Sequence, residues 1–178
     1  DSLHLASVGG HLEIVKCLLT EASSDIEAVG NKGFTSLLLA SEHGHLEIVK
    51  YLLVEARADI QATCNDSNNS LHLASVGGHL EIVKYLLMET SSDVEAIGNN
   101  GCTSLLLASY CGNLDIVKYL LVEARADIQA TSNDNNNSLH LASFGGHLEI
   151  VKLLVTETDL DLELPGRESA PSLLVAAH

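Results

Sequence analysis

Aromatic side chains are scarce in this chain. Its 178 residues include no Trp, two Phe and four Tyr, although 46% of the residues are hydrophobic. Leu, Ile, Val and Ala therefore supply most of the material for a core. Small aliphatic residues suit thin layers of helices better than one thick globular centre.

Positive charge is scarce as well. Nine Lys and Arg residues stand against 24 Asp and Glu residues, which gives a formal net charge of -15. Binding to nucleic acid depends on Lys and Arg that displace counterions from the phosphates, so neither a nucleic acid nor an anionic membrane is expected as partner. The acidity favours a protein partner with a basic rim. Alternatively, it only keeps a long surface in solution.

Long apolar runs and paired cysteines are also missing. No apolar stretch approaches the roughly 20 residues that span a bilayer, and no signal peptide is visible, so no membrane insertion is expected. None of the four cysteines belongs to a C-x-x-C pair. They are interpreted as free thiols of a reducing compartment, and a cytoplasmic location is expected.

An internal repeat dominates the sequence. A Ser-Leu pair recurs every 34 residues, at Ser2, Ser36, Ser70, Ser104, Ser138 and Ser172. A second period of 68 residues overlies the first, because odd units read SLHLAS and even units read TSLLLAS. Residues 2–69 and 70–137 are so alike that duplication of a two-unit block is the simplest explanation.

Each unit predicts two helices. The first is short and follows a residue that can cap the free amides of a helix start: Asp1, Thr35, Asn69, Thr103 or Asn137. The second is longer, and in 79–89 the apolar residues fall on one broad face. A single pair cannot bury that face alone, whereas stacked pairs can. The prediction is an all-α solenoid over residues 1–178, with helix pairs near 2–24, 36–58, 70–92, 104–126 and 138–160 and a partial sixth unit from about 172.

The repeat resembles the ankyrin repeat family. The similarity is carried by Leu71-His-Leu-Ala-Ser, by Gly78-His-Leu-Glu-Ile-Val-Lys and by Asp93-Val-Glu-Ala, and it recurs along essentially the whole chain. The resemblance implies two antiparallel helices per unit, a hairpin-like loop that projects sideways, and a concave groove. It also implies a protein-protein interaction module.

The sequence departs from the family pattern at four positions of the unit. Ser replaces the Pro that follows the cap, and Leu38 and Leu106 replace the motif His in the even units. Ser67 and Asn135 replace the loop Gly of the odd units. The Gly after the second helix is replaced by Ser23, Arg57, Ser91 and Arg125. Because a left-handed residue is easiest for Gly, the exact path out of the second helix does not carry over from the family.

The histidines raise the question of a metal or a catalytic site. His4, His72 and His140 lie two repeats apart, and helices pack roughly 8–10 Å from each other, so these residues cannot share an ion. A structural role near the loop and helix start is predicted for them, and for His11, His45, His79 and His147, which precede the second helices. Every Ser-His-Asp or Cys-His combination reuses residues that the repeat copies elsewhere. No enzyme activity, cofactor or metal is expected.

Candidate partner-binding residues lie at the exposed end of the first helix and just before its cap. They are Val8, Phe34, Glu42, His43, Val76, Cys102, Tyr110, Cys111 and Phe144. Between the duplicated blocks, Phe34 becomes Cys102, Glu42 becomes Tyr110 and His43 becomes Cys111. The clustering of these changes favours a binding face, and drift at tolerant positions is the alternative. A rival face would use Tyr51, Tyr85 and Tyr119 on the outer side of the second helices.

The expected function is to hold a partner protein in the concave groove. The alternative is a structural spacer or spring without a groove ligand. The chain opens directly on a helix and stops inside a sixth unit, whereas solenoids need polar capping repeats. It is therefore expected to be a segment of a longer array, with further repeats of the same polypeptide as neighbours, or to pair its ends with another molecule.

Overall fold

The computed structural model describes residues 1–156, which are helical apart from their connecting loops and contain no strand. The first helices of the five pairs are α1 (Ser2–Val8), α3 (Ser36–Glu42), α5 (Ser70–Gly77), α7 (Ser104–Cys111) and α9 (Ser138–Phe144). The second helices are α2 (Leu12–Thr20), α4 (Leu46–Val54), α6 (Leu80–Glu89), α8 (Leu114–Val122) and α10 (Leu148–Thr156). Short 3-10 turns, η1 (Asn31–Gly33) and η2 (Asn99–Gly101), lie in two of the loops. The predicted sixth unit lies outside the described residues.

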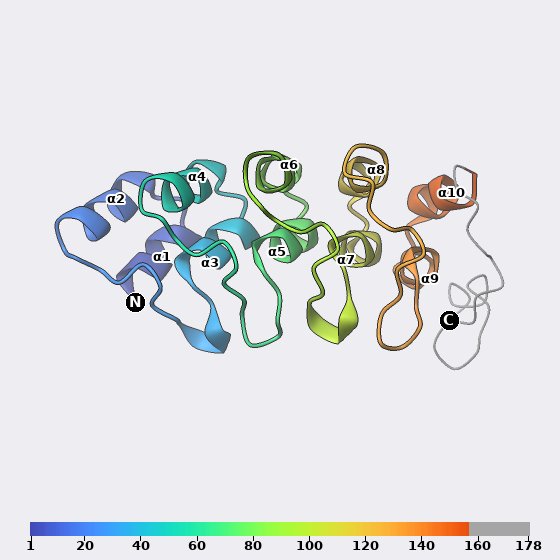
Figure 1. The fold of residues 1–178 in the computed structure, drawn as a ribbon, viewed down its shortest axis with the longest axis horizontal. Helices are drawn as coiled ribbons and strands as arrows, with labels where there is room; N and C mark the ends of the chain where they lie inside the picture. Colours follow the sequence, from blue (N-terminus) through green and yellow to red (C-terminus); the bar gives the residue numbers. More distant parts are fainter. Residues whose placement is uncertain (157–178) are drawn as a thin grey trace. The chain divides into compact units, whose positions relative to one another are not determined.

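The chain divides into two compact units, Asp1–Ser92 and a second one that starts at Asp93. In the first unit, α1, α3 and α5 form one layer, α2, α4 and α6 form another, and the loops project to one side (Figure 1). The second unit repeats this arrangement with α7 and α9 in one layer and α8 and α10 in the other. The predicted all-α class of stacked helix pairs is confirmed. That residues 1–178 form a single array stays a prediction.

All five first helices begin at the predicted caps. In the even units, the Thr35 hydroxyl accepts the Leu38 amide at 3.4 Å, and Thr103 does the same for Leu106. The odd units add the histidine: the Asn69 side chain accepts the His72 amide, and His72 Nδ1 accepts the Asn69 amide, both at 3.1 Å. His4 and His140 form the same reciprocal capping box. These contacts confirm the structural role predicted for the three histidines.

Stacking of successive pairs buries the second helices. Ile48 and Ile82 are each 1% exposed, whereas Ile14, at the same position of the first described pair, is 51% exposed. Complete burial of such a side chain contributes about 1.5–3 kcal/mol. The interface between neighbouring pairs is therefore a main source of stability in each unit.

The path out of the second helix keeps a left-handed residue without glycine in three of the four places considered. Ser23, Arg57 and Arg125 have φ of 50°, 60° and 55°. The exception follows α6, which extends to Glu89 and leaves Thr90 extended. A side chain in the left-handed region costs roughly 1–2 kcal/mol. Three exits thus keep the left-handed conformation at an energetic cost, and only the exit after α6 is extended.

A second cost lies at the serine that replaces the family proline. The hydroxyls of Ser36, Ser70, Ser104 and Ser138 are buried and have no hydrogen-bond partner. Each serine is the first residue of its helix, where the backbone amide has no partner within the helix in any case. Proline fits such a position because it lacks that amide.

We expect Ser36→Pro to stabilise the chain by about 1 kcal/mol, because it removes a buried hydroxyl that has no hydrogen-bond partner and reduces the conformational entropy of the unfolded chain. Thr35 already has ψ of 169°, the extended conformation that a following proline requires. Urea unfolding measures the change. Ser2→Pro is the control, since Ser2 occupies the same helix position but is exposed, and its gain should be smaller. Equal gains at both positions would contradict the account of the buried hydroxyl.

Candidate functional site

In each unit, the candidate residues define an inner-helix surface, formed by the C-terminal ends of the first helices and the loop residues before their caps. The first unit contributes Val8, Phe34, Glu42, His43 and Val76, and the second contributes Cys102, Tyr110, Cys111 and Phe144.

In the second unit, Tyr110 and Phe144 form an exposed aromatic pair at the ends of α7 and α9. Their ring centroids lie 6.1 Å apart with an interplanar angle of 17°, so the rings stack. Tyr110 is 47% exposed and Phe144 is 64% exposed. The same helices bury other residues, such as Leu105 and Leu139, in the core. The two rings are therefore available to a partner and are not needed for packing of the unit.

In the first unit, the equivalent positions hold Glu42 and Val76, and the surface is more polar. His43 stacks on His45 with centroids 6.5 Å apart, and its Nδ1 donates to the Leu39 carbonyl at 2.9 Å. The Glu42 carboxylate lies 3.9 Å from that nitrogen. Val76 is 37% exposed and Val8 is half-buried. This part of the surface offers charge and hydrogen bonds and less apolar area.

The loop residues Phe34 and Cys102 belong mainly to the packing between loop and helix. Phe34 is half-buried and packs against Leu38, Cys64 and Leu73. Cys102, its equivalent in the second unit, is 8% exposed. Its thiol therefore offers little surface to a partner. Phe34 remains partly exposed, and it also completes the core of its own unit.

The histidine of the next second helix fixes each inner-helix end. His45 Nε2 donates to the Val8 carbonyl, His79 Nε2 to the Glu42 carbonyl and His147 Nε2 to the Tyr110 carbonyl, each at 2.8 Å. The imidazoles thus satisfy carbonyls that a helix end leaves free. The predicted structural role of these three histidines is confirmed, and the contact also holds the backbone of Tyr110 in place.

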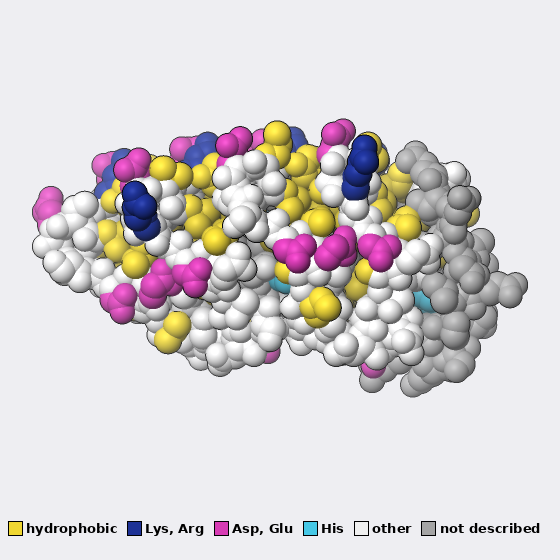
Figure 2. Space-filling view, viewed as in Figure 1, with side chains coloured by type: hydrophobic (Ala, Val, Ile, Leu, Met, Phe, Trp, Pro, Cys, Tyr) yellow, Lys and Arg dark blue, Asp and Glu magenta, His cyan; other side chains and the backbone are white. Residues whose placement is uncertain are grey.

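Acidic side chains in the loops after the second helices bind backbone amides of the next loop. Glu27 accepts the Asp59 amide at 2.8 Å, and Glu95 accepts the Asp127 amide at 2.7 Å. Figure 2 shows Asp and Glu side chains in two short rows on this face. The Glu27 and Glu95 carboxylates therefore link successive loops, and they also contribute to the negative field of each unit.

The described part of the chain holds no group of three or more His, Cys, Asp or Glu side chains placed to bind a metal. Within residues 1–156, no helix is long and apolar enough to cross a membrane. All four cysteines are free thiols.

Comparison with protein families matches residues 1–64 and 71–165 to a model of ankyrin repeats in three copies. The chain belongs to the ankyrin repeat family. Comparison with curated proteins gives no match. Ankyrin repeats are generally protein-protein interaction modules, and the family is typically non-enzymatic.

Two contacts of this ankyrin chain were not part of the sequence-based hypothesis. One is the bond from His147 to the Tyr110 carbonyl, and its signal is the constant spacing of 37 residues between the histidine and the inner-helix end. The other is a contact between repeats on the second helices, where the Lys16 ammonium lies 5.9 Å from the centroid of Tyr51 and Lys50 lies 6.0 Å from that of Tyr85. A constant spacing of 35 residues would have indicated it.

We expect Gly112→Ala to destabilise the chain by about 1 kcal/mol more than Gly146→Ala. Both glycines are left-handed, with φ of 81° and 76°. A Cβ on Gly112 would lie 2.5 Å from the His147 ring, whereas one on Gly146 would meet nothing within 4 Å. Thermal or urea unfolding of the two variants isolates the clash from the shared backbone strain. Equal losses would show that the contact with His147 does not position the end of α7.

We also expect Cys102 and Cys111 to be alkylated slowly at neutral pH. Burial raises the pKa of the Cys102 thiol, and the Asp134 carboxylate raises it further. Burial alone raises the pKa of Cys111. Since the thiolate is the reacting form, iodoacetamide labelling followed by mass spectrometry should rise only above the ordinary thiol pKa. The urea-unfolded chain is the control, and identical pH profiles in both states would contradict the expectation.

Proposed function

We propose that this ankyrin chain binds a partner protein on its inner-helix surface, with Tyr110 and Phe144 as the main anchors. The observation that carries the proposal is the exposed, stacked pair of rings on α7 and α9. Aromatic side chains dominate the energy of many interfaces when a partner buries them. The His147 contact supports the pair by holding the backbone of Tyr110 before any partner arrives.

The duplicated blocks give a reason to place the anchors in the second unit. Glu42 and Val76 stand where Tyr110 and Phe144 stand 68 residues later, although the helices around them are nearly the same. The scaffold therefore tolerates Glu and Val at these positions and does not require aromatic rings. We infer that the rings serve a contact, with Glu42, His43 and Val76 as polar and peripheral contributors.

The charge of the chain supports a partner with a basic rim. The net charge is -15, and acids such as Glu27 and Glu95 lie on the surface of the loops. Such a field steers a basic partner and speeds association more than it adds affinity. The proposed partner thus presents an apolar patch surrounded by Lys or Arg.

The outer tyrosines offer less surface than the inner pair. Tyr51 and Tyr85 are half-buried, and a Lys ammonium lies 5.9 Å from the ring centroid of Tyr51 and 6.0 Å from that of Tyr85. These rings are therefore largely occupied by contacts within the first unit.

We expect Tyr110→Ala with Phe144→Ala to weaken partner binding by at least about 2 kcal/mol, or roughly 30-fold in Kd. The free energy of unfolding should change little, because both rings are exposed. The partner is first captured by affinity purification with the wild-type chain and the double variant in parallel. Its Kd is then measured by calorimetry and its association rate by stopped-flow mixing, both at low and high salt, where added salt should slow association without abolishing the complex.

Glu42→Ala with Val76→Ala is the matched comparison at the equivalent positions of the first unit, and it should weaken binding less than loss of the two rings, because these residues are peripheral. Tyr110→Glu with Phe144→Val is a second variant, because the chain already carries these residues at the equivalent sites. Normal binding by the aromatic-deficient variants, with loss of binding on substitution of Tyr51, Tyr85 and Tyr119, would place the interface on the outer helices. Failure of the wild-type chain to retain any stoichiometric partner would favour a structural spacer.

A further inference from the structure

In the first unit, a lysine of one second helix lies beside a tyrosine of the next second helix. The Lys16 ammonium lies 5.9 Å from the centroid of Tyr51, and the Lys50 ammonium lies 6.0 Å from that of Tyr85. Each lysine also pairs with a glutamate three residues earlier, Lys16 with Glu13 at 2.7 Å and Lys50 with Glu47 at 2.9 Å. A lysine on these helices therefore has both an aromatic ring and a carboxylate as neighbours.

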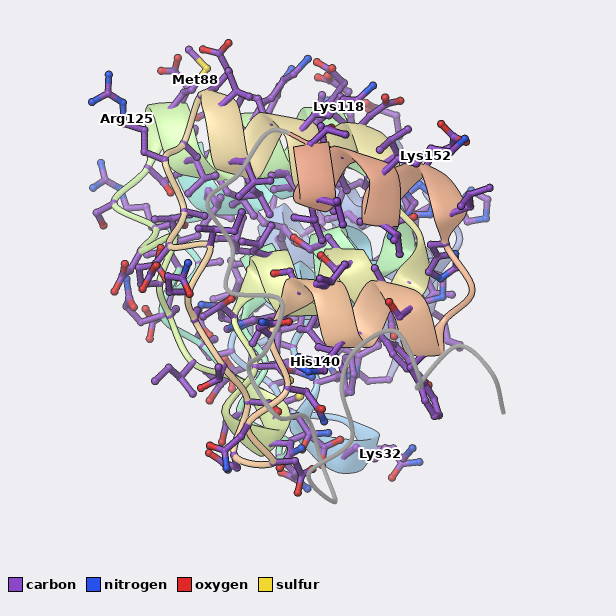
Figure 3. The ribbon with its side chains drawn as sticks, turned by 90° about the vertical axis from the view of Figure 1, so that its right-hand side faces the viewer. Lys32, Met88, Lys118, Arg125, His140 and Lys152 are labelled. Carbon is purple, nitrogen blue, oxygen red and sulfur yellow. The ribbon has the colours of Figure 1, made fainter. Side chains whose placement is uncertain are left out.

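Within the described part of the chain, Lys118, the equivalent lysine of α8, has neither an aromatic ring from α10 nor a paired carboxylate. Leu153 stands 35 residues after Lys118, at the spacing at which Lys16 and Lys50 each have a tyrosine. Asp115 stands where the other repeats have glutamate, and its side chain is one methylene shorter. Among the described residues, Lys118 forms no ion pair, and it is exposed whereas Lys16 and Lys50 are half-buried. Figure 3 shows Lys118 on the side of the second helices.

A surface hollow of about 330 Å³ occupies this place. Its lining consists of Lys118, Tyr119, Val122, Glu123 and Leu153. Val122 is 64% exposed and Leu153 is half-buried, so the hollow has apolar walls that water reaches. The volume is at the lower end of the roughly 300–1,000 Å³ of ligand pockets, which suits one side chain better than a larger ligand.

We propose that this hollow receives a tyrosine side chain of a partner protein, with its ring beside the Lys118 ammonium and against Val122 and Leu153. The occupant has the chemistry that Tyr51 and Tyr85 supply to Lys16 and Lys50 within the first unit. An ammonium without a paired carboxylate favours an aromatic face over an aliphatic side chain, because the face of the ring carries negative potential. The hollow is therefore proposed to bind an aromatic ring and not any apolar side chain.

The aromatic residues of the given sequence lie elsewhere or already have contacts, so we take the ring from a partner protein. Residues 157–178 contain no Phe, Tyr or Trp, and each of the six Phe and Tyr residues of the sequence lies within the described part. Of those six, Tyr119 lines the hollow itself, and Tyr110 and Phe144 stack on each other at the ends of α7 and α9. The hollow lies on the second helices, so this site and the inner-helix surface stand or fall independently.

The test uses N-acetyltyrosinamide as the probe and the full chain as the receptor. Methyl NMR signals of Val122 and Leu153 are followed during titration, with N-acetylleucinamide as the matched ligand. We expect saturable shifts with the tyrosine compound and none with the leucine compound. Lys118→Ala should weaken the response about threefold, whereas Lys50→Ala should leave it unchanged because Lys50 already has Tyr85 as its neighbour.

Leu153→Tyr fills the hollow from within. Tyrosine stands at this position in α4, α6 and α8, so the variant is expected to fold and to lose the shifts at Val122. Its circular dichroism and Tm verify the fold. If that variant does not fold, the comparison of Lys118→Ala with Lys50→Ala decides the question. Absence of saturable shifts, equal shifts with the leucine compound, or an unchanged response in Lys118→Ala would overturn the proposal.

Discussion

Contact between successive helix pairs is the constraint on which each unit depends. A helix of nine residues such as α4 presents a broad apolar face, and that face is buried only when another pair covers it. The contrast between Ile14 and Ile48 shows how completely the neighbour decides burial. Because burial of this kind needs the same residue at the same place in each repeat, the core positions are kept while the remaining positions are free to vary.

Polar contacts set the spacing that this stacking requires. His147 binds the Tyr110 carbonyl, and Glu95 binds the Asp127 amide, each from one repeat to its neighbour. These bonds are made to backbone groups. They do not use the exposed side chains at the inner-helix ends. A surface whose backbone is held in place, and whose Tyr110 and Phe144 rings already stack, is well suited to recognition, since little ordering remains when a partner binds.

The duplicated blocks show how one scaffold carries different surfaces. Glu42 gives way to Tyr110, and Phe34, which covers Leu73, gives way to Cys102, while Leu37 and Leu105 stay fully buried in both blocks. On the outer helices, the change from tyrosine to Leu153 removes a ring and leaves a hollow beside Lys118. In each case the altered residue lies where the loss of one contact does not break the stack.

The sequence alone determined the repeat length, the helix starts and the caps, because these depend on local hydrogen bonds and on the period of apolar residues. The histidine roles at His72 and His140 followed from the same local logic. Exposure could not be obtained in this way: Cys102 was expected on the surface, yet the loop packing buries it. Nor could the stacking of Tyr110 on Phe144, or the hollow beside Lys118, since both depend on distances between residues more than 30 positions apart. Only the packed helices bring such residues together, and only that packing decides which side chains remain available to a partner.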